Sequence, residues 1–180
     1  MSSSLFFSRS MLVLLVLGVI ACQSPIEKLR KTRSCEGCNL QGADLSQQDL
    51  IGVNLRKANL RGANLAQANL NGADLTGADM RGANLYKTYL RADLSNVNLS
   101  RASLVEANLR SARLSGAILR DADLDRASLF KATLQSAFLN NANLSGADFR
   151  HADLSNVKLE GVRFCSTRMP GGEINDRDCR

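Results

Sequence analysis

One apolar residue recurs at every fifth position of this chain from Leu40 to Phe164, and this period limits the fold more than any other feature. The register runs in fives to Leu90, loses one residue, resumes at Leu94 and continues in fives. It has 26 central positions (11 before the slip and 15 after), of which 23 are leucine; the others are Met80, Phe149 and Phe164. The residue two before the centre is alanine in 19 of the 26 repeats.

A period of five fits neither an α-helix nor a flat strand. Five residues advance an α-helix by about 140° net, so the leucines would spiral over every face. In a flat strand the side chains alternate, so each repeat would reverse the face. Both apolar positions point inward only if the chain turns a corner after each repeat. Four corners close a coil of about twenty residues, and stacked coils bury a continuous column, as in solenoid proteins.

The remaining three positions of each repeat are typical of solvent-exposed turns. The residue before the centre is usually Asn or Asp, both of which tolerate turn conformations. The second residue after the centre is often glycine, which suits a turn that needs a positive φ angle. These glycines are Gly42, Gly52, Gly62, Gly72, Gly77, Gly82, Gly116, Gly146 and Gly161.

The repeated order of Ala, then Asn or Asp, then Leu resembles the pentapeptide-repeat family, as in Ala63-Asn64-Leu65 and Ala73-Asp74-Leu75. The resemblance covers residues 35–164 and implies an all-β fold, a right-handed quadrilateral β-helix. On that fold 26 repeats make roughly six and a half coils, spaced by about 4.8 Å.

The N-terminal residues 1–21 are typical of a signal peptide. Met11 to Ala21 is apolar but too short to span a bilayer, which needs about twenty residues. Val19-Ile20-Ala21-Cys22 resembles the lipobox of bacterial lipoproteins, which implies cleavage before Cys22, lipidation of that cysteine and an exported, membrane-anchored protein on the periplasmic side. The alternatives are an ordinary signal peptide or an uncleaved anchor. By the same analogy, Gln23 in place of Asp favours the outer membrane.

Residues 22–34 are predicted to form the lipidated cysteine and a basic tether. Four cations, Lys28, Arg30, Lys31 and Arg33, face one anion, Glu27, a net charge of +3 (four minus one). Next to a lipid anchor this charge favours anionic head groups. A solvated linker that keeps the protein soluble is the alternative.

Five cysteines suit an exported protein in an oxidising compartment. Cys35 and Cys38 lack the βαβ context of a redox motif and the second pair of a zinc site, so they are predicted to be small core residues or a short local disulfide. The segment from Cys165 to Cys179 is similar to a tail that follows many pentapeptide repeats. A Cys165–Cys179 disulfide would close a loop of about 15 residues, stabilise by about 3 kcal/mol and make residues 165–180 a cap over the last coil's open edge.

No catalytic, metal or cofactor site is expected. A core filled by leucine and alanine leaves no interior cavity for a small-molecule substrate. His151 is interpreted as a surface histidine rather than a general base. Asp121, Asp123 and Asp125 alternate as in a calcium loop, but they lie across a corner and are flanked by arginines, so they are interpreted as a solvated corner. The chain is therefore predicted not to be an enzyme.

Arginines are predicted to stack on two opposite sides of the solenoid, counting four repeats per coil. Arg61, Arg81 and Arg120 share one side, and Arg91, Arg110 and Arg150 share the opposite side. Such columns suit an acidic protein, anionic head groups or a polysaccharide. The alternative is that these charges only keep the rod soluble.

The predicted function is a non-enzymatic scaffold or protein-interaction module of the bacterial cell envelope, tethered to the membrane by a lipid anchor. A second hypothesis follows from family members that mimic DNA and bind topoisomerase, but that mimicry needs an acidic rod in the cytoplasm. Residues 35–164 carry 15 Lys and Arg against 13 Asp and Glu, a net charge of +2. A third hypothesis, nucleic-acid or head-group binding through the arginine columns, is weakened for nucleic acid by this near-neutral charge and few aromatic residues.

Overall fold

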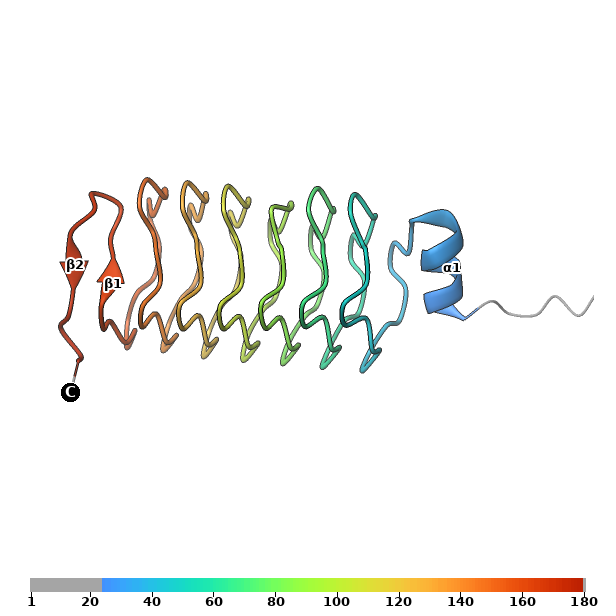
Figure 1. The fold of residues 1–180 in the computed structure, drawn as a ribbon, viewed down its shortest axis with the longest axis horizontal. Coiled ribbons are helices and arrows are strands. Elements are labelled where there is room, and N and C mark those ends of the chain that lie inside the picture. The colour runs from blue at the N-terminus through green and yellow to red at the C-terminus, as the bar shows by residue number, and fades with distance from the viewer. Residues whose placement is uncertain (1–23, 180) are drawn as a thin grey trace, which may run out of the picture.

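The computed structural model describes residues 24–179, so the expected signal peptide and Cys22 lie outside the described residues. Over these described residues there is one helix, α1 (Pro25–Thr32), and there are two short strands, β1 (Thr167–Arg168) and β2 (Ile174–Asn175). Between them it winds in coils that lie side by side along one long axis, with α1 at one end and β1 and β2 at the other (Figure 1).

Parallel bridges join each coil to the next. Every bridge links residues that stand directly before a central position, twenty positions apart as in Asn39 and Asn59, or nineteen apart across the slip as in Asp74 and Asp93. The 24 bridges fall on four sides, so they make six interfaces (24 divided by four) between seven coils. The stack is therefore four-sided.

Corners between five-residue repeats have the left-handed backbone conformation that the glycine positions predict. The N–H of Ala43 donates to the carbonyl of Leu40 at 3.1 Å, and between them Gly42 has a φ of 64°. Residues with side chains also adopt this left-handed conformation, for example His151 with a φ of 60°. Solenoid stacking therefore imposes the turn even where the local sequence does not favour it.

The interior is the predicted column of leucine and alanine, and Leu109 at mid-length is fully buried. Two polar side chains are buried among the described residues, Thr88 and Thr167. Their hydroxyls donate to the carbonyls of Leu65 at 2.8 Å and Leu144 at 2.7 Å. Each hydroxyl therefore has the partner that a buried polar group needs.

The coil geometry continues past Phe164, where the sequence predicts that the repeat stops. Thr167 takes the inward position, Arg168 bridges to Asp148, and the N–H of Phe149 donates to the carbonyl of Arg168 at 2.7 Å. The last coil thus ends at Met169, and the first bridged residue is Ser34, directly before Cys35. These two additional repeats bring the 26 to 28, which makes seven coils rather than six and a half. Sequence alone missed the last repeat because Met169 replaces the usual leucine and Thr167 the usual alanine. Strand β2 then pairs antiparallel with β1 on that coil.

The segment predicted as a basic tether contains a helix, α1, from Pro25 to Thr32, which was not expected from the sequence. Ser24 caps it, because its Oγ accepts the N–H of Glu27 at 3.2 Å. Leu29 is 1% exposed and packs into the core, so α1 covers the N-terminal end of the stack. Serine followed three residues later by glutamate, with proline at the first helical position, is the sequence signature that predicts this start.

The missing residue between Leu90 and Leu94 is absorbed at one corner. Bridges continue across the slip on all four sides, from Asp74 to Asp93 and from Tyr89 to Asn108 among them. Ala92 takes the inward position and is 6% exposed. The deletion therefore shortens a corner without interrupting the stack.

Within residues 24–179, no helix combines the length and apolar character that crossing a bilayer requires.

Candidate functional site: two arginine faces

The first arginine face is the outward column Arg61, Arg81, Ser100 and Arg120, with its corner neighbours. These residues sit directly after the central positions of one side, so coil stacking sets their spacing at about 4.8 Å. Ser100 is short, and its Oγ donates back to Asn98 at 2.7 Å, which leaves a gap between the arginines. A surface hollow of about 440 Å³ opens there, lined by Arg61, Arg81, Gly82, Ser100, Arg101, Arg120 and Asp121.

Carboxylates neutralise part of the first arginine face. Nε of Arg81 donates to Asp79 at 2.8 Å, and this hydrogen bond holds the pKa of the Asp79 carboxyl below its ordinary value. Nε of Arg101 lies 3.9 Å from the carboxylate of Asp121. Arg120 instead lies over the ring of Phe138, with Cζ 5.5 Å from the ring centroid. The face thus combines paired and unpaired guanidinium groups.

The second arginine face lies on the opposite side and contains Arg91, Arg110, Phe130 and Arg150. Phe130 organises it, because Cζ of Arg110 and of Arg150 lie 4.4 Å and 5.8 Å from its ring centroid. Nζ of Lys131 is 5.4 Å from the same centroid, and the His151 ring meets the Phe130 ring edge-on at 5.3 Å. Cation–π contacts of this kind hold the cations in place at the surface.

A hollow of about 420 Å³ opens on the second arginine face, lined by Asn71, Arg91, Asn108, Arg110, Ser111, Phe130 and Lys131. No carboxylate lines it. Arg150, just outside, donates to Asp148 through Nε at 2.9 Å and lowers the pKa of that carboxyl. The cations that line this hollow are therefore less neutralised by carboxylates than those that line the hollow on the first arginine face.

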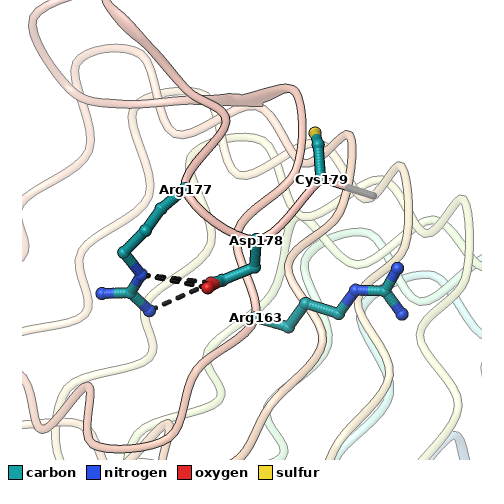
Figure 2. A pocket seen from close by; sticks show the side chains of 4 residues that line it. All are labelled: Arg163, Arg177, Asp178 and Cys179. Atoms are coloured by element: carbon teal, nitrogen blue, oxygen red, sulfur yellow. Dashed lines mark hydrogen bonds and ion pairs between the residues drawn. The ribbon is translucent and has the colours of Figure 1, made fainter.

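A third hollow, of about 480 Å³, lies at the C-terminal end beside Arg163, Arg177, Asp178 and Cys179. Figure 2 shows Arg177 and Asp178 facing one another, with Arg163 extending away from them. The Asp178 carboxylate accepts the N–H of Phe164 at 2.9 Å, and Arg177 donates to the carbonyl of Val162 at 2.8 Å. This pair replaces hydrogen bonds that a further coil would supply, so it serves as a cap.

The four described cysteines form two disulfides, Cys35–Cys38 and Cys165–Cys179, with Cα atoms 5.2 Å and 4.7 Å apart. Cys35 is buried, whereas Cys38, also expected to face inward, is half-buried. Cys165, Asp176 and Cys179 lie close enough together to resemble a metal site. Disulfide sulfurs are not thiolates, so this group offers a metal one carboxylate only.

The other residues weighed from sequence also have structural partners. His151 packs against Phe130, and Asp121 pairs with Arg101. Asp123 accepts hydrogen bonds from the N–H of Asp125 at 3.1 Å and from Nδ2 of Asn143 at 2.9 Å. These contacts stabilise the turn at the corner and connect neighbouring coils.

Sequence reasoning placed the six arginines in their columns but missed the other residues around them. Asn71, Asn108, Ser111 and Lys131 line the second hollow, next to the corner that lacks one residue. The four-residue side from Leu90 to Leu94 was the sequence feature that could have indicated a hollow here. Whether a missing residue leaves a hollow depends on the side chains of the two neighbouring coils, which the local sequence does not show.

Known protein families resemble this chain in its repeat region. The family model for pentapeptide repeats matches four segments, residues 34–65, 58–91, 92–129 and 127–164. No curated protein matches the sequence.

Several solved structures resemble the chain. HetL, a pentapeptide repeat protein involved in heterocyst differentiation regulation from the cyanobacterium Nostoc sp. strain PCC 7120, is 26% identical; the match covers 83% of this chain and 98% of HetL, with a TM-score of 0.30. Rfr23 from the cyanobacterium Cyanothece 51142 is 27% identical over 77% of this chain and 92% of its own, with a TM-score of 0.33. The family match spans residues 34–164 and hence most of the sequence. This chain therefore belongs to the pentapeptide repeat family.

Proposed function

We propose that this protein, as a right-handed four-sided β-helix, is a non-enzymatic interaction module that is tethered to a bacterial membrane through Cys22 and presents its arginine faces to an acidic partner in the cell envelope. One observation carries the proposal: two opposite sides of one rod each hold an arginine column beside a hollow. Among the described residues, Arg61, Arg91, Arg110 and Arg120 have no carboxylate within 4.0 Å.

The position of α1 supports the tether. Ser24 caps α1 and is only two residues from Cys22, a reach of about 7 Å. A lipid on Cys22 therefore puts the α1 end of the rod at the head groups. The cations of α1, Lys28, Arg30 and Lys31, lie at this end, with Lys31 3.2 Å from Glu27 and the others unpaired in the described chain. Attraction to anionic lipids adds to the anchor.

The charge of the rod favours this function over DNA mimicry. A protein that imitates DNA needs a dense anionic surface, whereas residues 35–164 carry 15 cations and 13 anions. A topoisomerase partner also requires a cytoplasmic location, which the leader opposes. Nucleic-acid binding through the arginine faces would also require a cytoplasmic location, so the proposed export argues against it as well.

Fractionation of the full chain tests the tether. We expect wild-type protein to sediment with membranes, preferentially outer membranes, and Cys22→Ala to be released from them. Ser24→Ala, which keeps the cysteine, is the matched control and should sediment like wild type. A soluble cytoplasmic location for both wild type and Cys22→Ala would overturn the lipoprotein assignment and return the topoisomerase hypothesis to consideration.

Site-specific photo-cross-linking tests the arginine faces. A cross-linking residue at Ser100 lies on the first face, and the same residue at Ser115 lies on a neighbouring side with similar partial exposure. We expect an envelope protein to be captured from Ser100 and not from Ser115, with capture lost in the Arg61→Glu, Arg120→Glu double variant. Equal capture from both positions would show that the arginine face is not the binding surface.

A further inference from the structure

The hollow on the second arginine face originates in the missing corner residue. At an ordinary corner, the second residue after the centre adopts a left-handed conformation and its side chain lies on the surface. In the corner column of this side Gly52 and Gly72 come first, the next coil has no such residue, and Ser111, Lys131 and His151 follow. Neither Arg91 nor Ala92 has a positive φ. An absent residue beside a glycine therefore leaves a notch, which is the hollow of about 420 Å³.

The side-chain amides at the notch present N–H donors. Oδ1 of Asn71 accepts the backbone N–H of Arg91 at 3.1 Å, and Oδ1 of Asn108 accepts that of Arg110 at 3.2 Å. These bonds orient both amides, so each NH₂ group points away from the backbone it serves. Neither NH₂ group donates a hydrogen bond within the described part of the chain. Together with the hydroxyl of Ser111, they provide free donors.

Three cations surround these donors without a compensating anion. Arg91, Arg110 and Lys131 line the notch, and none has a carboxylate within 4.0 Å among residues 24–179. Phe130 holds Arg110 and Lys131 over its ring, which limits their motion before a ligand arrives. The first face differs here, because Asp121 lines its hollow and pairs with Arg101. Fixed cations with free donors select an anion rich in acceptor oxygens.

The missing residue also leaves a backbone acceptor open. At other corners the carbonyl of the residue after the centre accepts an N–H from the preceding coil, as Arg120 does from Arg101 at 2.9 Å. The equivalent donor to the carbonyl of Arg110 is the residue that the slip removed, and no described N–H replaces it. A ligand that carries one O–H beside several acceptor oxygens fits this set of groups better than a fully ionised carboxylate.

We propose that the notch is a binding site for a phosphate group, either a soluble phosphomonoester or a phospholipid head group that ends in a phosphomonoester, as in phosphatidic acid. Arg110 and Arg91 contact the phosphate oxygens from one side of the notch and Lys131 from the other, while the amides of Asn71 and Asn108 complete the donors. A singly protonated phosphomonoester carries a charge of about −1, keeps one O–H to donate to the open carbonyl of Arg110, and has further oxygens that accept from the cations and amides. The proposal rests on the proposed function only in taking the second arginine face as a binding surface, and it does not require the lipid anchor.

Titration with inorganic phosphate tests the site on the full chain carrying Cys22→Ala, so that no lipid anchor contributes. Calorimetry at constant ionic strength, with chloride as the competing anion, gives the dissociation constant. We expect Arg110→Gln to weaken phosphate binding about tenfold or more, as the loss of a charge-assisted hydrogen bond predicts. Arg120→Gln is the matched control, because Arg120 also lies over a phenylalanine, on the opposite face. Equal weakening by both variants would overturn the notch as a discrete site.

Inserting one glycine between Arg91 and Ala92 is the sharper variant. It restores a five-residue corner and keeps every cation, so it fills the notch while leaving the net charge unchanged. We expect phosphate binding to be lost and the thermal melt to be retained. If the inserted variant melts like its parent and still binds phosphate equally well, the anion binds elsewhere and the proposal is overturned.

Vesicles distinguish the two sources of phosphate. The same Cys22→Ala chain is sedimented with phosphatidylcholine vesicles that contain phosphatidic acid, with and without Arg110→Gln. Binding that Arg110→Gln abolishes supports a head group, and phosphate binding without vesicle binding supports a soluble phosphomonoester; failure to bind either one overturns the site. Partner capture at Ser100 is measured separately, so a failed phosphate site and a failed interaction module give different results.

Discussion

At the scale of single residues, the Asn and Asp before each central position do more than tolerate a turn. Their Oδ1 atoms accept the backbone N–H two residues on, as in Asn64 with the N–H of Ala66 at 3.2 Å. The amide of an asparagine also reaches the preceding coil, as Nδ2 of Asn84 donates to Oδ1 of Asn64 at 3.1 Å. Aspartate supplies the first bond but lacks the donor for the second. Asparagine thus links coils as well as shaping the turn.

The buried hydroxyl of Thr88 gives a prediction at this scale. Thr88→Val keeps the shape of the side chain but removes the donor to the Leu65 carbonyl, which still accepts the N–H of Ala68 at 3.0 Å. We expect the free energy of unfolding to fall by about 1 kcal/mol, measured by chemical denaturation. Thr133→Val, on a partly exposed outward position, is the control and should change stability by less than about 0.5 kcal/mol. Indistinguishable effects of the two variants would refute a stabilising role for the buried hydroxyl.

At the scale of elements, the ends of the solenoid are closed by different devices. Helix α1 packs Leu29 on the first coil, and Arg33, just after the helix, donates to the carbonyl of Asp49 at 2.8 Å. At the other end β2 pairs with β1, and Asp178 and Arg177 bond to Phe164 and Val162. Side-chain groups thus replace the backbone partners of a missing coil. Such covering limits pairing of an open edge with another chain.

Helix α1 should stabilise the first coil through Leu29. We expect Leu29→Ala to destabilise the protein by about 2–3 kcal/mol, at the lower end for buried leucines because the site lies at the end of the core. Hydrogen exchange should accelerate at the amide of Asn54, which donates to the carbonyl of Arg33. Arg30→Ala, on the exposed side of the same helix, is the control. Unchanged exchange in Leu29→Ala would show that the first coil does not depend on α1.

Acid should loosen the C-terminal cap. The hydrogen bond from Arg177, followed by that from the backbone of Phe164, lowers the pKa of Asp178 from an ordinary value of 3.8. A carboxyl whose pKa is lowered on folding stabilises the folded state fully above the ordinary pKa and loses this effect as the pH falls through the lower, folded value. We therefore expect faster exchange of the Phe164 amide below about pH 3.8.

Asp178→Asn is the control for that titration. The amide keeps an acceptor for Phe164 but has no charge to lose, so its exchange should depend less on pH in this range. Other aspartates, including Asp79 and Asp148, also have lowered pKa values, so the global melt should fall in acid in both proteins. Identical pH profiles at Phe164 in the two proteins would contradict the role of the carboxylate.

At the scale of the whole molecule, stability comes from a continuous apolar column that every coil shares. Each repeat buries only a few apolar atoms, and its backbone hydrogen bonds run to the neighbouring coils, so no coil is stable alone. A charge in the column therefore affects the whole stack. The outward positions, in contrast, lie in contact with solvent, where a charged side chain stays hydrated.

The pair Leu109 and Arg110 tests this division directly. Leu109 is fully buried at mid-length, and Leu109→Asp places an unpaired charge in the column, so we expect the solenoid to unfold at room temperature, as judged by circular dichroism. Arg110 is the next residue and is exposed, and Arg110→Asp should leave the thermal melt nearly unchanged. Equal tolerance of both substitutions would mean that the inward and outward register is wrong.

The five-residue period was sufficient to predict the solenoid, the buried positions and the two arginine columns, because all three depend only on how many residues separate one corner from the next. It also gave the position of the slip. It did not give the helix before the first coil or the last repeat, where Thr167 and Met169 depart from the usual residues.

The sequence by itself determined which residues face inward and which share a side, since a strict local period fixes both. Only the tertiary structure decided which arginines are paired with carboxylates, which lie over aromatic rings and where the surface is hollowed. Those properties depend on side chains about twenty residues apart along the chain, and on whether a neighbouring coil supplies a partner or a gap. The notch beside Arg91 depends on neighbouring coils in the same way: its own coil lacks one corner residue, and the next coil contributes the small side chain of Ser111 to the lining.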